Sequence, residues 1–105
     1  IVACGANDAD LAGAINAVIA RRGGLSVAAG GDVGVEVLPL PIAGLMSDAE
    51  GTLVAAEYAR LTAAARDLGS PLGSPFMTLA FMALLVSDRG LFCGAEFRFV
   101  PLFVE

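Results

Sequence analysis

An apolar stripe at helical spacing, flanked by two helix-end signals near the start of the chain, constrains the fold more than any other feature. The stripe consists of Leu11, Ala14, Ile15, Val18 and Ile19. Apolar residues three and four positions apart line one side of an α-helix, and that side must pack on something. Asn7 is typical of a helix N-cap, and glycines are typical of a helix end. The sequence therefore predicts a helix from Asn7 to the pair Gly23 and Gly24, with Arg21 and Arg22 in its last turn.

A β-hairpin is expected to follow this helix. Residues 25–29 are typical of a strand, and Gly30, Gly31 and Asp32 supply a turn. Three valines then alternate with small or charged residues as in a half-buried strand: Val33, Val35 and Val37. In residues 38–41 leucine alternates with proline. Because proline lacks an N–H donor, this stretch is predicted to run extended and outside any sheet interior.

A second amphipathic helix is predicted from residue 48 onward. Ser47 and Glu50 have the spacing of a capping box, in which each side chain bonds a free N–H at the helix start. Its apolar face is expected to consist of Val54, Tyr58, Leu61, Ala65 and Leu68. Gly69 and Pro71 should end it. Ser74 and Pro75 are suited to start a third helix. Residues 76–86 are so uniformly apolar that periodicity does not separate a helix from a buried strand, and the helix is the favoured interpretation.

The last part of the chain is predicted to form a turn and a closing strand. Residues 88–90 mark the turn, and Phe97, Phe99 and Phe103 alternate with other residues over 97–103. Pro101 makes this strand an edge or a bulged strand. The expected fold is one α+β domain over residues 1–105, a mostly antiparallel sheet with two to three helices packed on one face.

Composition limits the partners of this domain. It is 57% hydrophobic and only 16% charged, so part of its apolar surface is expected to meet a partner. The longest apolar run, residues 76–86, is shorter than the roughly 20 residues that a membrane helix needs. Eleven acidic residues stand against six arginines, and this negative charge disfavours nucleic acid as a partner.

The sequence offers little for catalysis. It has no histidine, so Ser-His and Cys-His nucleophile pairs and imidazole ligands for zinc are excluded. Cys4 and Cys93 stand far apart in sequence, and two buried free thiols are expected. Two close carboxylate pairs, Asp8 with Asp10 and Asp48 with Glu50, could bind a cation, but both precede predicted helices and helix capping explains them better.

The loop over residues 39–48 is the remaining candidate site. Its two prolines and its glycine restrict its shape, and it presents apolar side chains. A rigid apolar loop of this kind is either a contact between domains or part of a ligand cleft. The candidate residues are Leu45, Met46, Ser47 and Asp48, and the domain contact is the favoured interpretation.

Residues 38–48, LPLPIAGLMSD, resemble a signature of the carboxy-terminal domain of microbial adenine deaminases, members of the amidohydrolase superfamily. The resemblance continues in the same order through four further segments: GANDAD at 5–10, GGL at 23–25, SPFMTLAF at 74–81 and FRFVPLFV at 97–104. It implies a parent enzyme that converts adenine and water to hypoxanthine and ammonia in purine salvage. The stretch 84–88 is shorter than the family pattern, and Ile1 suggests a chain cut from a longer one.

The resemblance also implies where the chemistry lies. The family's catalytic barrel holds a divalent metal, manganese or iron, on histidine and acidic ligands, and none of those positions exists in this chain. We therefore expect no catalytic residue and no cofactor here. The implied setting is a cytoplasmic homo-oligomer in which this domain packs against the amidohydrolase barrel. The alternative is a stand-alone module that binds a small molecule or a protein and has no enzymatic activity.

Overall fold

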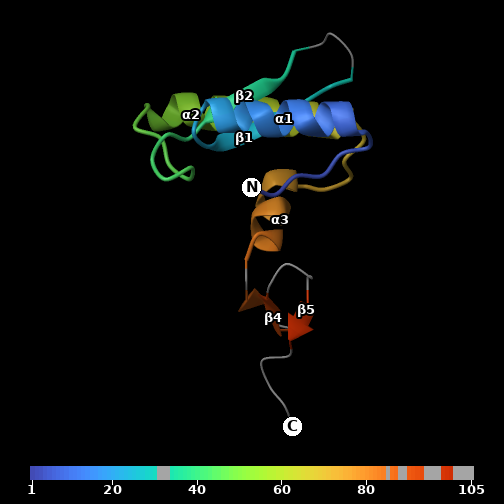
Figure 1. The fold of residues 1–105 in the computed structure, drawn as a ribbon. Coiled ribbons are helices and arrows are strands. Elements are labelled where there is room, and N and C mark those ends of the chain that lie inside the picture. The colour runs from blue at the N-terminus through green and yellow to red at the C-terminus, as the bar shows by residue number, and fades with distance from the viewer. Residues whose placement is uncertain (31–33, 85, 88–89, 94–97, 101–105) are drawn as a thin grey trace.

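The computed structural model describes residues 1–30, 34–84, 86–87, 90–93 and 98–100. In this part of the chain three helices accompany a two-stranded and a three-stranded antiparallel sheet (Figure 1), which confirms the α+β class. The elements in chain order are α1 (Asp8–Ala20), β1 (Gly24–Val27), β2 (Glu36–Pro39), α2 (Gly51–Asp67), α3 (Pro75–Met82), β3 (Val86–Ser87), β4 (Gly90–Cys93) and β5 (Arg98–Val100). None of the described helices has the length and hydropathy required to cross a bilayer.

Helix α1 begins as predicted and ends slightly earlier. The Asn7 side chain accepts a hydrogen bond of 2.9 Å from the N–H of Asp10, which confirms the N-cap. At the other end the N–H groups of Arg22 and Gly23 donate back into the last turn, to Ile19 and Val18. This pair of bonds is a Schellman motif. Arg21 is the C-cap residue and Arg22 lies beyond it at φ 60°, so the prediction that both lie in the last turn is wrong.

Strand β2 lies later in the sequence than the valine alternation indicated, whereas β1 begins one residue before the predicted strand 25–29 and ends at Val27. Leu25 pairs with Leu38, and Gly24 pairs with Pro39. Leu38 and Pro39 are therefore extended and paired, and they stay outside a sheet interior as predicted, because β2 is an edge strand. Both strands of a two-stranded sheet are edges, so Pro39 can end β2 without leaving a ladder bond unmade. Part of the predicted turn, residues 31–33, lies outside the described residues.

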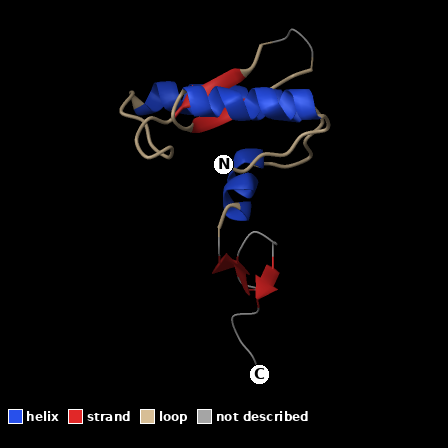
Figure 2. Cartoon of the chain, in the orientation of Figure 1, coloured by secondary structure: helices blue, strands red, loops and turns tan. Residues whose placement is uncertain are grey.

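Helices cover both faces of this hairpin, a distribution that differs from the expected single covered face. Leu25, Val27 and Leu38 share the face that packs on α2. Ser26 points the opposite way, and its hydroxyl donates to the carbonyl of Ala14 in α1 over 2.9 Å. Successive side chains in a strand alternate between faces, so α1 and α2 enclose the hairpin between them (Figure 2).

The core is small and centres on α2. Val27, Leu38, Leu61 and Phe76 are buried, and Leu61 has no exposed surface. The predicted apolar face of α2 is confirmed at Val54, Tyr58, Leu61 and Ala65, all in or against this core. Leu68 was wrongly assigned to that face: it follows the last residue of α2 and is exposed. Tyr58 meets Phe76 edge to face at 6.0 Å between ring centroids.

The predicted start of α2 is wrong. The helix begins at Gly51, and Glu50 occupies the N-cap position without a side-chain capping bond. The Ser47 hydroxyl instead accepts a 3.1 Å hydrogen bond from the N–H of Ala49, two residues away. Serine often closes such a local turn in place of capping a helix. For α3 the predicted start is confirmed, because Pro75 is its first residue. The predicted extent to residue 86 is wrong, because the helix ends at Met82 and Val86 lies in β3.

The three short strands near the end pair in sequence order. Val86 pairs with Leu91, and Phe92 pairs with Phe99. Residues 98–100 of the predicted closing strand are therefore confirmed as β5. Phe97, Pro101 and Phe103 of that prediction, and the turn residues 88–89, lie outside the described residues.

Candidate functional site

The candidate loop contains a tight turn at residues 42–46. The N–H of Ile42 donates to the carbonyl of Met46 over 3.0 Å, and the N–H groups of Leu45 and Met46 both donate to the carbonyl of Ile42. Ala43 and Gly44, the two central residues, have φ angles of 55° and 74°. Two successive left-handed residues are typical of a type I′ turn, in which alanine is strained and glycine is not. These hydrogen bonds and φ angles therefore fix the backbone of residues 42–46 in one conformation.

Two glycines follow α1, and Gly23 lies against this turn while Gly24 lies against β2. The N–H of Leu40 donates to the carbonyl of Gly23 over 3.2 Å. A β-carbon on Gly23 would lie 2.4 Å from the α-carbon of Gly44, and one on Gly24 would lie 2.2 Å from the carbonyl oxygen of Leu38. Only glycine allows the backbones to approach so closely. Sequence reasoning assigned the pair to a helix end alone, although a second consecutive glycine was a signal of this contact.

The four candidate residues do not converge on one point. Leu45 and Met46 are 78% and 57% exposed, Asp48 is exposed, and Ser47 is half-buried with its hydroxyl bound to the Ala49 N–H. Leu45 lines a neighbouring hollow, which Met46, Ser47 and Asp48 do not.

The hollow next to the turn, which we call the apolar hollow, has a volume of about 430 Å³. Five segments form it: residues 1–4, α1, the stretch 23–26, the turn residues 43–45, and α3. No charged side chain lines it among the described residues, and its polar side chains are Cys4 and Ser26. Ser26 is already bonded to Ala14. Cys4 is exposed, so the expectation of a buried thiol is wrong at this position. The side chain of Cys93 lies outside the described part.

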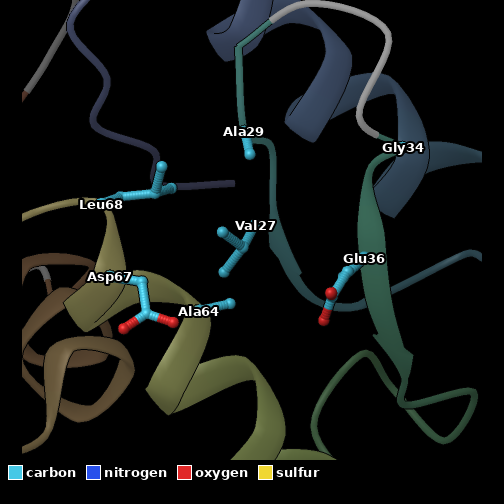
Figure 3. Close-up of a pocket in the computed structure, with 7 residues that line it drawn as sticks. All are labelled: Val27, Ala29, Gly34, Glu36, Ala64, Asp67 and Leu68. Carbon is cyan, nitrogen blue, oxygen red and sulfur yellow. The ribbon is translucent and has the colours of Figure 1, made fainter.

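A smaller hollow of about 210 Å³ lies between the hairpin and the end of α2 (Figure 3). Glu36 and Asp67 are the carboxylates on its wall, with Val27 between them in this view. Glu36 is paired with Arg60 at 2.5 Å, and Arg60 also binds Glu57 at 2.6 Å. The hydrogen bond to Glu57, together with the charges of both carboxylates, raises the pKa of Arg60 above its usual value. Arg60 therefore remains a fixed cation, and Glu36 is engaged in an ion pair.

The carboxylate pairs have structural surroundings. Asp10 accepts a 2.5 Å bond from the amide of Asn7 and lies with Asp8 in the first turn of α1, where the helix dipole favours negative charge. Asp48 and Glu50 precede α2. Within the described ranges no three His, Cys, Asp or Glu side chains gather as metal ligands would. Together with the absence of histidine, this means that these residues do not fit a barrel-type metal centre.

Comparison with known proteins identifies the family of this chain. The family model described as the adenine deaminase C-terminal domain matches residues 1–97. This chain belongs to that family. Proteins called adenine deaminase from Salinibacter ruber, Methanosarcina acetivorans and Sulfurovum sp. are 54%, 47% and 50% identical to it over 100%, 100% and 95% of its length. No solved structure matches it.

The C-terminal domain spans about 20% of the length of each of these three relatives. Its alignment with the Salinibacter ruber protein covers 112 positions, against 105 residues in this chain. The relative therefore has residues that this chain lacks, at positions that the comparison does not place. The prediction that the stretch 84–88 is the shortened part stays a prediction.

Proposed function

We propose that this chain is the non-catalytic C-terminal domain of an adenine deaminase, which converts adenine and water to hypoxanthine and ammonia in purine salvage. The observation that carries the proposal is the family match over residues 1–97. The chain also aligns with about a fifth of the length of relatives that are called adenine deaminases. The proposed role of the domain is to complete the enzyme's fold, and the proposed deaminating site lies in the remaining polypeptide.

The side chains of the domain support a non-catalytic role. Deamination by water requires proton transfers to and from the reacting groups, and histidine or an unpaired carboxylate near a cavity usually performs them. The chain has no histidine, the described lining of the apolar hollow has no charged group, and Glu36 beside the smaller hollow is paired with Arg60. The apolar hollow thus provides binding surface but no proton shuttle. Asp67, on the wall of the smaller hollow, has no ion pair among the described residues and no second acid-base group free beside it.

The metal of the proposed enzyme would be held outside this chain. We propose a manganese or iron centre in an amidohydrolase barrel that precedes the domain, with the domain packed on that barrel in a cytoplasmic homo-oligomer. The described side chains do not fit such a centre, so no step of the reaction is assigned to them.

Ammonia release tests this proposal. The full-length polypeptide that contains these residues should release ammonia from adenine when manganese or iron is added, and the 105-residue chain alone should release none. A chelator-treated sample of the full-length polypeptide is the matched control. Activity from the isolated chain would refute the non-catalytic role of the domain. An inactive full-length polypeptide would refute the proposed deaminase activity. A polypeptide that lacks any barrel would favour the stand-alone binding module.

A further inference from the structure

Helix α1 is apolar around most of its circumference and yet is not buried. Between Asp10 and Arg21 its one polar side chain is that of Asn16, and none of its thirteen residues is buried. Helices that are apolar on all sides are normally found inside a protein. The hairpin covers one side of α1 through the Ser26 contact, while Ile19 on another side is 57% exposed.

Helix α2 shows the contrasting pattern on its outer surface. Glu57 and Arg60 form an ion pair there, and Arg66 follows near the end of the helix, where it donates to the carbonyl of Gly73. A surface with charges of both signs is typical of contact with water. The described part of the domain therefore has a charged side on α2 and an apolar side on α1, with the hairpin between them.

The apolar side continues from α1 across the apolar hollow to α3. Ile15 and Val18 of α1, Leu45 of the turn, and Leu79 and Ala80 of α3 all line the hollow. We call this surface the apolar face. Beyond it, α3 leaves Phe81 and Met82 65% and 70% exposed. Contiguous apolar surface of this kind usually marks an interaction site.

We propose that the apolar face is the surface on which the rest of the polypeptide packs, and that an apolar segment from that part inserts side chains into the apolar hollow. This inference rests on the proposed function for the existence of that part. A covalently attached segment has a high effective concentration, which favours it over a second copy of the domain. A small molecule fits less well, because ligand pockets position several free polar groups, and the Ser26 hydroxyl is already bonded.

Cysteine alkylation in the native full-length polypeptide tests the assignment, with each site quantified by mass spectrometry of its peptide. The Ala80→Cys variant places a thiol in the apolar hollow, and the Ala56→Cys variant places one on the charged side of α2; both alanines are exposed on helices here. We expect alkylation at position 80 to be at least about tenfold slower than at position 56, because covered sites react only after opening. Native Cys4, which also lines the hollow, should be protected without any substitution.

The same measurements on the 105-residue chain identify what covers the apolar face. Positions 4 and 80 should react there as fast as position 56. Protection already present in the isolated chain, or protection that rises with protein concentration, would overturn the proposal in favour of self-association. A full-length polypeptide that deaminates adenine but leaves positions 4 and 80 unprotected would refute the apolar face and leave the function standing. Protection in a polypeptide without deaminase activity would refute the function and support the face.

Discussion

Replacing Gly24 by alanine is expected to be among the most damaging single-methyl changes in this domain. Gly24 has a φ of 140°, a region that residues with a β-carbon rarely adopt. The added carbon would also lie 2.2 Å from the carbonyl oxygen of Leu38, which belongs to the paired strand β2. Neither atom can rotate away, since both are fixed by the backbone of the hairpin. Relief requires β1 and β2 to separate.

Two other glycines separate the two contributions to this loss of stability, backbone strain and steric overlap. Gly69 has a φ of 99° but open space around it, so Gly69→Ala should cost only the strained backbone, about 1 to 3 kcal/mol. Gly51 has open space and begins α2, so Gly51→Ala should be neutral or stabilise by up to about 1 kcal/mol. Gly24→Ala combines strain with overlap and should cost about 3 to 5 kcal/mol. That is a large share of the roughly 5 to 15 kcal/mol that stabilises a typical domain.

Urea unfolding of the three variants measures these differences. The chain has one tyrosine and no tryptophan, so fluorescence reports on Tyr58, which packs on Phe76 in the core. Circular dichroism of the helices provides a second probe and a test of two-state unfolding. The free energy of unfolding is expected to be highest for Gly51→Ala, lower for Gly69→Ala and lowest for Gly24→Ala. Equal losses for Gly24→Ala and Gly69→Ala would refute the close approach of β1 and β2 at this corner.

Three further substitutions test the core, a helix cap and the candidate loop. Leu61→Ala should lower the unfolding free energy by about 3 kcal/mol in urea titrations. Leu53→Ala, on the exposed side of the same helix, should change it by less than about 0.5 kcal/mol. Similar losses for the two variants would contradict the assignment of Leu61 to the core. Asn7→Ala should cost about 1 kcal/mol by the same assay, and Asn7→Ser should restore most of it. In the full-length polypeptide of the proposed deaminase, Ser47→Ala should lower the melting temperature slightly and leave the Michaelis constant for adenine unchanged, because the hydroxyl accepts from the Ala49 N–H. A changed Michaelis constant would place the loop in the substrate cleft.

Predictions from local sequence were most accurate where a few neighbouring residues determine the conformation. The N-cap at Asn7, the apolar face of α2 around Leu61, and the start of α3 at Pro75 were all confirmed. Each depends on bonds or spacings within one or two turns of chain. The Ser47 capping box failed even so, because its hydroxyl had two local N–H partners within reach, and sequence spacing does not rank them.

Contacts between distant segments escaped sequence reasoning. The β2 register was predicted from the valine alternation, whereas burial of Leu38 against Leu61 shifted the strand onto Pro39. The arrangement of α1 and α2 on opposite faces of the hairpin follows from where Ser26 and Val27 point, and alternation alone does not say which helix takes which face.

The sequence by itself determined the family, the N-cap of α1, the first residue of α3, most of the apolar face of α2, and the lack of histidine chemistry. Those properties belong to residue types and to short-range spacing, which a chain retains whatever it packs against. Tertiary structure alone decided that Gly23 lies against Gly44 of the turn and Gly24 against β2, and that α1 and α3 form one apolar face. Close backbone approach and shared surfaces arise only when segments twenty or more residues apart meet, because packing rather than local preference sets their positions.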